Sequence, residues 1–394
     1  MKVTNIEVLA HDLTGRDGLE LWRPVIVRIG TDDGITGLGE LGMAYGIGAP
    51  AGAAMIAELA ERFILGANPF DNERIWETML RRTFWAEGGG PVVFGAMSAL
   101  DAALWDIKGK ALNMPVYQLL GVTEAKPLRA YASQLQFDWD DTVDELADPV
   151  RYGEAAAKAL AEGYDCVKVD PCMITAEGTR ELNMRGLLDP ARRNLYRARM
   201  EAIRDALGPD VDIIIELHSF TSAPGAVQLA RLFEDLDIML LEEPTHYNSP
   251  QAHLWVKQQT AIPLATGERL YTRWGYQPYF EAGSIDVIQP DLGLVGGITE
   301  GKKICDLAHL YDVGVQAHVC GSPVATAIAL HLEAAIPNFE IHEHHSFAKK
   351  ACNRELVEPD LQPKGGVFTV SDRPGFGIEL TAAGEKPANK VVVK

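Results

Sequence analysis

Cysteine is scarce in this chain, and the few cysteines present are scattered. Its 394 residues include five cysteines, an odd number without any Cys-x-x-Cys pair. Disulfide frameworks need paired cysteines, and cysteine zinc sites or dithiol redox sites need them at short spacings. The cysteine pattern therefore argues against a disulfide-stapled domain and against cysteine-based zinc or redox chemistry.

Long apolar runs and positive charge are scarce as well. No apolar stretch approaches the roughly 20 residues that span a bilayer, and residues 1–30 carry neither the basic leader nor the apolar region of a signal peptide. With 36 Lys and Arg against 55 Asp and Glu, the formal net charge is −19. Such a chain lacks the basic surface that neutralises phosphates. We expect a cytoplasmic protein that binds neither membranes nor nucleic acids.

The residues that are abundant predict a folded chain with two domains. Hydrophobic residues make up 47% and charged residues 23% of the sequence, as in ordinary globular proteins, and the length exceeds what one core usually organises. Residues 25–39 predict a β-hairpin that turns at Asp33-Gly34, and apolar residues recur at steps of three and four along 97–107, as on one face of a helix. We expect residues 1–125 to form a small α+β domain that resembles a lid.

Beyond residue 125 the pattern changes to short β-like segments that alternate with helix-length connections. Eight such segments are present: Leu128–Ser133, Cys166–Val169, Val211–Ile215, Met239–Leu241, Leu264–Thr266, Asp286–Gln289, Gly314–Ala317 and Phe339–Ile341. This alternation is typical of parallel βαβ units, and the number of segments predicts a closed α/β barrel over residues 126–360. We expect the turn-rich tail, residues 361–394, to fold back on the first domain.

Polar residues follow most of these strands, in or just beyond their last positions. They are Lys168 and Asp170, Glu216 and His218, Glu242 and Glu243, Glu268, Gln289 and Asp291, His318, and Glu343. Steps of 26, 26, 23, 27 and 25 residues separate Glu216, Glu242, Glu268, Asp291, His318 and Glu343 in turn. The carboxyl ends of barrel strands meet at one mouth, where catalytic sites lie, so these side chains should converge. The alternative is a set of unrelated strand-closing residues joined in salt bridges, but one member per βα unit favours a functional set.

Three of these residues are carboxylates on successive strands, Glu216, Glu242 and Glu268. They form a set of hard oxygen ligands suited to Mg²⁺, with coordination positions left for water and substrate. A carboxylate substrate bound to that ion could lose its α-proton, because the metal stabilises the resulting enediolate as a Lewis acid. For the proton transfers, His318 suits a general base that Asp291 orients, and His218 could protonate a departing hydroxyl group.

With these residues the sequence resembles the enolase superfamily, in particular its mandelate racemase-like subgroup and the acid-sugar dehydratases within it. The segment 98–109 is similar to that family's capping-domain helix, and the similarity runs over nearly the whole chain. The resemblance implies an α/β fold in which a (β/α)7β TIM-like barrel, residues 126–360, lies beneath an α+β N-terminal capping domain, residues 1–125, completed by the tail 361–394.

The resemblance also implies roles for individual residues. It makes Glu216, Glu242 and Glu268 the Mg²⁺ ligands and pairs Asp291 with His318 as a catalytic dyad. Lys168 matches a lysine that contacts the substrate carboxylate, and Glu343 matches a carboxyl group that hydrogen-bonds it. Both therefore count as catalytic and substrate-binding residues.

Three features depart from the family pattern. Many relatives carry Lys-x-Lys on the second strand, with the second lysine as a base, whereas this chain has Asp170 there, which we place among the substrate-binding residues. Racemisation needs two bases that flank one carbon, so this change argues against a racemase. Glu216 stands where Asp is commoner, and Glu216-x-His218 resembles aldonate dehydratases in which this histidine protonates the 3-hydroxyl. The 48 residues from Lys168 to Glu216 predict an insertion near 171–199 that trims the pocket or joins a subunit contact.

We therefore predict a Mg²⁺-dependent hydro-lyase that dehydrates a sugar acid to a 2-keto-3-deoxy acid. The substrate would be an aldonate, such as galactonate or gluconate, or an aldarate. The alternatives are an epimerase or cycloisomerase of a sugar acid on the same scaffold, and a non-catalytic protein that binds metal and sugar acid. We expect a small-molecule substrate and a homo-oligomer.

Three further patterns have simpler interpretations. The run Gly37-x-Gly39-x-x-Gly42 lacks the βαβ unit of a dinucleotide site, so we expect its glycines to serve turns. The histidines beside Glu343, which are His342, His344 and His345, are expected to pack locally or to line the mouth. Arg269 and Glu243 are left outside the site because they can pair with each other.

Overall fold

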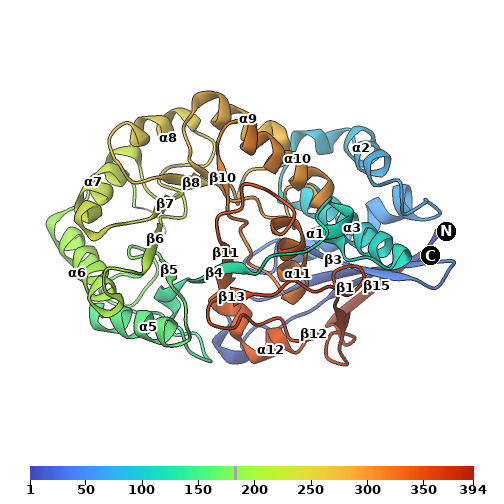
Figure 1. The fold of residues 1–394 in the computed structure, drawn as a ribbon, viewed down its shortest axis with the longest axis horizontal. Coiled ribbons are helices and arrows are strands. Elements are labelled where there is room, and N and C mark those ends of the chain that lie inside the picture. The colour runs from blue at the N-terminus through green and yellow to red at the C-terminus, as the bar shows by residue number, and fades with distance from the viewer. Residues whose placement is uncertain (182–183) are drawn as a thin grey trace.

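The computed structural model describes residues 1–181 and 184–394 (Figure 1). Two main sheets organise the chain: an antiparallel sheet built largely from the N-terminal segment, and a parallel sheet surrounded by helices. A two-stranded ribbon, β12 (Val357–Glu358) with β14 (Glu379–Leu380), lies near the C-terminus.

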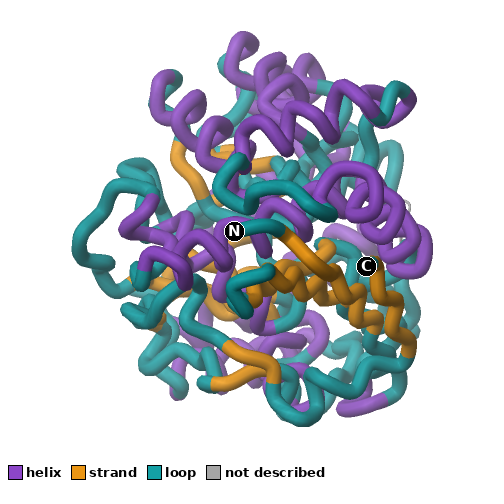
Figure 2. Tube along the Cα trace, turned by 90° about the vertical axis from the view of Figure 1, so that its right-hand side faces the viewer, coloured by secondary structure: helices purple, strands orange, loops and turns teal. Residues whose placement is uncertain are grey.

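The antiparallel sheet joins the two ends of the chain. Its strand order is β15-β1-β2-β3, with bounds β1 (Val3–Ala10), β2 (Val25–Thr31), β3 (Thr36–Leu41) and β15 (Asn389–Val393). The predicted hairpin is β2–β3, and Gly34 takes a positive φ of 78° in its turn, which costs glycine little. β15 pairs with β1, so the first and last strands of the chain lie side by side in this sheet (Figures 1 and 2).

Two helices of the N-terminal segment, α1 (Ala49–Leu59) and α3 (Pro91–Leu112), pack on this sheet. Of the other two, α2 (Asn72–Arg82) packs on α3, and α4 (Val116–Leu119) contacts α3 and α11. A Cβ atom at Gly39 would lie 2.0 Å from the carbonyl oxygen of Ala99 on α3, and one at Gly37 would lie 2.2 Å from that of Ala103. These glycines therefore permit close packing of β3 on α3, and the expectation that they serve turns was wrong.

The second sheet has eight parallel strands in the order β10-β9-β8-β7-β6-β5-β4-β11. Their bounds are β4 (Leu128–Ser133), β5 (Cys166–Val169), β6 (Asp212–Glu216), β7 (Leu240–Glu242), β8 (Leu264–Thr266), β9 (Val287–Ile288), β10 (Gly314–Val315) and β11 (His342–His345). A single parallel bridge from Val315 to Phe339 links β10 to the segment before β11. Side chains such as Tyr131, Ile214 and Leu240 fill the interior, so the barrel is packed below its mouth.

Within the described residues, seven α-helices alternate with these eight strands, one in each connection. They are α5 (Pro149–Ala161), α6 (Pro190–Leu207), α7 (Ala223–Phe233), α8 (Pro250–Lys257), α9 (Thr272–Ala282), α10 (Gly297–Leu310) and α11 (Pro323–Glu333). The predicted (β/α)7β barrel with an α+β N-terminal domain is thus confirmed. A short helix, α12 (Ala351–Arg354), follows β11. The tail contacts both sheets, because β13 (Val367–Phe368) pairs with β4 while β15 pairs with β1. The exact domain boundaries stay a prediction.

Several barrel helices begin with the same local signal, a capping side chain followed by proline. Asp148, Asp189 and Ser322 each accept a hydrogen bond from a backbone N–H of the first turn of α5, α6 and α11. Proline at the next position has no N–H to satisfy and already has a helical φ. The dipeptides Asp-Pro and Ser-Pro therefore define where these helices begin after their strands.

The last barrel strand was predicted at the wrong place. The apolar segment 339–341 makes only the bridge from Phe339 among the described residues, and β11 begins at His342. Each polar side chain of β11 finds a buried partner, as His342 does with Glu333 of α11 at 2.5 Å. A strand whose polar residues have buried partners carries no apolar signal, so the sequence pattern points to the apolar segment next to it.

Glu40 at the end of β3 joins the N-terminal sheet to the barrel. Its buried carboxylate accepts hydrogen bonds from Ser322 N at 2.8 Å, Ser322 Oγ at 2.5 Å and Ala325 N at 2.9 Å. These groups form the first turn of α11, which follows His318 in the chain. The contact therefore places the N-terminal domain beside the barrel mouth. Among the described helices, none is both long and apolar enough to cross a bilayer.

Candidate active site

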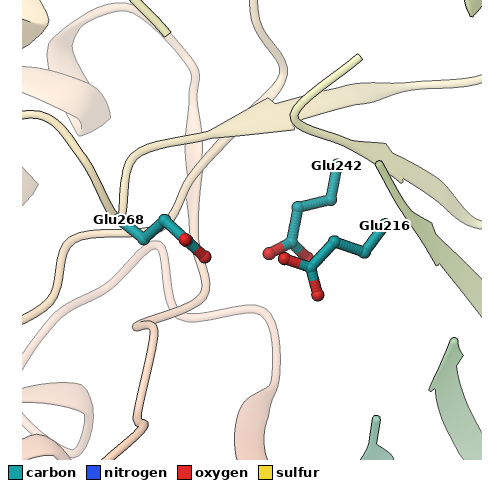
Figure 3. Close-up of side chains that lie close together, drawn as sticks. All are labelled: Glu216, Glu242 and Glu268. Carbon is teal, nitrogen blue, oxygen red and sulfur yellow. The ribbon is translucent and has the colours of Figure 1, made fainter. Parts of the chain in front are cut away.

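Three glutamates gather at the carboxyl ends of neighbouring barrel strands. Glu216 ends β6, Glu242 ends β7, and Glu268 follows β8 by two residues. Each offers a carboxylate oxygen, and these oxygens all lie within 4.8 Å of one another (Figure 3). All three side chains are buried. The strand-end spacing thus brings the three predicted metal ligands to one point.

Lys168 on β5 lies among these carboxylates. Its Nζ is 3.1 Å from Glu216, 2.9 Å from Glu242 and 3.0 Å from Glu343, and the side chain is 1% exposed. Burial opposes its charge, but the three carboxylates outweigh this and hold the pKa of Lys168 well above its usual value. The amine is therefore a permanent ammonium ion at the centre of the site.

The glutamate cluster carries more negative charge than Lys168 can balance. Burial, with the neighbouring charge of Glu216, raises the pKa of Glu242 well above its usual value. The Oε1 atom of Glu216 is buried and lies 3.1 Å from His218 Nε2, but makes no well-formed hydrogen bond among the described residues. A divalent cation would relieve both defects, because it supplies positive charge and accepts oxygen ligands. These three residues fit a Mg²⁺ site on that ground.

Asp291 and His318 form a hydrogen-bonded pair beside the cluster. The Nδ1 atom of His318 lies 2.8 Å from Asp291 Oδ2, and its Nε2 lies 3.5 Å from Glu268. Burial opposes the charge of the ring, but Glu268 and Asp291 raise the pKa of His318 to about 10. Since the Nδ1 proton is held by Asp291, Nε2 is the atom that can exchange a proton with a substrate.

Asp170 and His218 form a second pair of the same kind. The Nδ1 atom of His218 lies 2.7 Å from Asp170 Oδ2, and its Nε2 lies 3.1 Å from Glu216. Burial opposes the charge of this ring too, but Glu216 and Asp170 raise the pKa of His218 to about 9. His218 has a positive φ of 47°, an uncommon backbone conformation for a non-glycine residue that often marks functional sites.

Glu343 lies on β11, which pairs with β4, at the edge of the site next to β4. Its Oε1 accepts a hydrogen bond from Ser133 Oγ at 2.6 Å, and its Oε2 accepts one from Val319 N at 2.9 Å. Although burial opposes ionisation, Lys168 and His318 hold the pKa of Glu343 well below its usual range. Glu343 is therefore an ionised group that ties Lys168 to the backbone next to His318.

Two glutamines of the first barrel connection belong to the site but were not predicted. Gln134 Nε2 donates to Glu216 Oε2 at 2.7 Å, and Gln136 Nε2 donates to Gln134 Oε1. Gln136 Oε1 in turn accepts the backbone N–H of Asp170 at 3.1 Å. These residues directly follow β4, so the strand-end rule that identified the other site residues would have found them on this strand as well.

The residues left outside the predicted site lie close to it. Arg269 pairs with Glu243, as expected, but also with Glu268, so it balances one of the three clustered carboxylates. Two of the histidines around Glu343 pack locally: His342 bonds Glu333 and His344 bonds Tyr164.

The insertion predicted near 171–199 follows β5. Residues 182–183 of this segment lie outside the described residues. Arg180 reaches the N-terminal domain, where its guanidinium donates to the Tyr45 hydroxyl at 2.6 Å. Arg199 of α6 donates to the carbonyl oxygens of Pro171 at 2.8 Å and Ile174 at 2.6 Å, which fixes the start of the segment. The segment therefore contacts both domains.

Known proteins similar to this chain share both of its parts. Residues 8–121 match the family described as mandelate racemase / muconate lactonizing enzyme, N-terminal domain, and residues 151–384 match the one described as enolase C-terminal domain-like. The chain is 31% identical to a D-xylonate dehydratase of Haloferax volcanii, over 96% of this chain and 88% of that protein. It is 32% identical to a D-galactonate dehydratase of Ralstonia nicotianae, over 92% of this chain and 90% of that protein.

A solved structure has the same fold over its full length. It is a member of the enolase superfamily from Salmonella Typhimurium, 48% identical, which covers 100% of both chains with a TM-score of 0.94. The resemblance inferred from the strand-end residues is thereby confirmed.

Proposed function

Because the chain belongs to the mandelate racemase and muconate lactonizing enzyme family of the enolase superfamily, we propose that it is a hydro-lyase that dehydrates a sugar acid to a 2-keto-3-deoxy acid. One observation carries this proposal: two histidines, each with its Nδ1 on an aspartate, place their Nε2 atoms beside one glutamate cluster. Dehydration needs a base at C2 and an acid at the leaving hydroxyl. Similarity to D-xylonate and D-galactonate dehydratases supports the same reaction class.

The glutamate cluster suits the carboxylate end of the substrate. Mg²⁺ held by Glu216, Glu242 and Glu268 would balance their charge and act as a Lewis acid that stabilises the enediolate. Lys168 places its ammonium against the same carboxylates, where it can attract the substrate carboxylate and lower the pKa of the α-proton. Glu343 holds this ammonium in place at 3.0 Å.

His318 is the base in this proposal. Asp291 keeps a proton on Nδ1, so the lone pair of Nε2 takes the C2 proton and Asp291 stabilises the imidazolium that forms. A base must be neutral, but the negative charge of Glu268 beside Nε2 raises the pKa of His318 and favours the protonated ring. A cation that balances Glu268 would lower this pKa. His318 therefore acts as a base once the carboxylates of the cluster have their cation.

His218 is the acid. The ring is buried next to the cluster, and Glu216 and Asp170 favour its protonated form. It gives the Nε2 proton to the 3-hydroxyl as the C–O bond breaks, and water leaves. The resulting enol becomes the 2-keto-3-deoxy acid. His218 follows β6, and the base His318 follows β10, four strands away in the eight-stranded barrel. Acid and base can therefore reach different carbons of one substrate.

An epimerase or cycloisomerase on the same scaffold is the rival. Epimerisation at C2 needs a second base, and the second-strand position that supplies a lysine base in many relatives holds Asp170, whose Oδ2 is taken by His218. A protein that only binds metal and sugar acid would have no use for two ordered imidazoles.

The test is a screen of the purified chain with Mg²⁺ against a library of aldonates and aldarates. Semicarbazide detects 2-keto acids by absorbance, so it reports dehydration and ignores epimers. We expect at least one aldonate or aldarate to give a 2-keto acid, with the rate lost on chelation of the metal. Solvent deuterium exchange at C2 without any keto acid across the library would instead assign the chain to epimerisation or cycloisomerisation.

A further inference from the structure

The aspartates of the two aspartate–histidine pairs are held in the same way. Asp170 Oδ1 accepts the backbone N–H groups of Cys172 at 2.8 Å and Met173 at 2.9 Å, which leaves Oδ2 for His218. Asp291 Oδ1 likewise accepts the N–H of Gly293 at 2.7 Å, two residues downstream. In each pair one oxygen fixes the carboxylate to its own loop and the other faces a ring nitrogen.

His218 is held on further sides. The Phe220 ring stacks on the imidazole, with centroids 5.9 Å apart and planes at 21°. The backbone N–H of Asp170 is tied to Gln136, which connects through Gln134 to Glu216. The ring is thus fixed with Nδ1 toward Asp170 and Nε2 toward the glutamate cluster.

We propose that Asp170 is a positioning residue that keeps the proton on His218 Nδ1, so that Nε2 can give up its proton as an acid. This inference rests on the proposed dehydration. It also gives Asp170 a role other than contact with the substrate. The carboxylate is fully buried and already makes three hydrogen bonds within the protein, so it has little to offer a substrate hydroxyl.

The variant Asp170→Asn tests the positioning role of Asp170. Asparagine has the same shape as aspartate, but it reverses the direction of the hydrogen bond to His218 Nδ1. Two backbone N–H groups face Oδ1, so the carbonyl oxygen of the asparagine would take that side. Its NH₂ group would then face His218 Nδ1 and force that nitrogen to be an acceptor. The neutral ring would then carry its one proton on Nε2. Loss of that proton would leave an imidazolate anion, so the ring cannot serve as the acid.

The kinetic experiment compares Asp170→Asn with Asp291→Asn in D₂O, using Mg²⁺-loaded protein and the sugar acid found in the screen. Semicarbazide measures dehydration, and proton NMR measures exchange of the C2 proton. We expect Asp170→Asn to lose about 10²- to 10⁴-fold in dehydration while exchange continues, and we expect the same of His218→Asn. Asp291→Asn should lose both, because its histidine is the base. Dehydration at the wild-type rate by Asp170→Asn, or equal loss of both reactions, would overturn the proposal.

A second measurement needs no substrate. Ring ¹⁵N NMR of the Mg²⁺-loaded protein, at a pH where the ring is neutral, shows which nitrogen carries the proton. The signal of His218 is identified by its absence from His218→Gln. We expect Nδ1–H in the wild type and Nε2–H in Asp170→Asn. The same proton position in both would refute the role of Asp170. Failure of the substrate screen would instead count against dehydration. The NMR result could still be interpreted, because it does not depend on a substrate.

Discussion

Replacement of Lys168 by methionine would remove the cation that the buried glutamates share. The side chain is 1% exposed, and its Nζ lies within 3.1 Å of Glu216, Glu242 and Glu343. Methionine has a similar length and no charge, so these carboxylates would face one another without their ammonium. Loss of one partner from a buried ion pair costs about 3–5 kcal/mol. We expect metal-free Lys168→Met to lose at least about 3 kcal/mol in free energy of unfolding, a large part of the roughly 5–15 kcal/mol of a typical protein.

Urea unfolding followed by circular dichroism in metal-free buffer at neutral pH measures this loss. Lys158→Met is the matched control. Its Nζ lies 2.9 Å from Asp138 and 3.0 Å from Asp140, but the side chain is 39% exposed. Because water screens such pairs, the control should lose about 0–1 kcal/mol. Mg²⁺ should restore stability to Lys168→Met, by about 2.7 kcal/mol at 100 times its dissociation constant.

The loss should also depend on pH in a definite direction. Burial and Glu216 already raise the pKa of Glu242 above its ordinary 4.5 with Lys168 present, and removal of the ammonium raises it further. A carboxyl group whose folded pKa exceeds its unfolded pKa costs nothing below the unfolded value and destabilises increasingly as the pH rises above it. The difference between Lys168→Met and wild type should therefore shrink toward acid pH. A loss at neutral pH no larger than that of Lys158→Met would refute this account of the cluster.

Two further predictions concern single histidines. His318→Asn should lose both C2 deuterium exchange and keto-acid formation by about 10²- to 10⁴-fold, and exchange at the wild-type rate, measured by proton NMR, would remove His318 as the base. His253 is buried with Nδ1 at 2.7 Å from Thr245 Oγ1, and burial lowers its pKa to about 4. Its folded pKa thus lies below the ordinary 6.5, so the wild type should lose stability as the pH falls from 6.5 toward 4, and His253→Gln should flatten this decline in the urea midpoint. If the urea midpoint of His253→Gln declined with falling pH as steeply as that of the wild type, His253 would not be the cause of the decline.

The glutamate cluster could be predicted from sequence because barrel geometry leaves little freedom. Each βα unit returns the chain to the same mouth, so Glu216, Glu242 and Glu268, 26 residues apart, had to lie on neighbouring strand ends. The same reasoning brought Asp291 to His318, which follows the next strand. Periodicity of this kind survives small errors in strand bounds, as the shifted limits of β6 and β7 show.

The partners of these residues could not be predicted, because they depend on side-chain directions. The strand-end rule covers the position of Gln134 after β4, but not its hydrogen bond to Glu216, which lies 82 residues later. The close packing at Gly37 and Gly39 depends on where α3 crosses the sheet, and this position cannot be inferred from the glycine motif. Likewise, the polar strand β11 exists because buried groups on α11 and β4 satisfy it, so its own sequence gives no strand signal.

Asp170 bears on both the proposed dehydration and the rival racemisation or epimerisation. In this structure position 170 faces Nδ1 of His218 at 2.7 Å. A lysine ammonium there would repel a protonated ring and could accept no proton from Nδ1, so His218 could not be held as an acid. An aspartate does the opposite: it favours the protonated ring, and being a fixed carboxylate it cannot replace the lysine as a base on the substrate. Under the proposed mechanism, the residue that argues against racemisation is therefore the same residue that positions His218 as the acid.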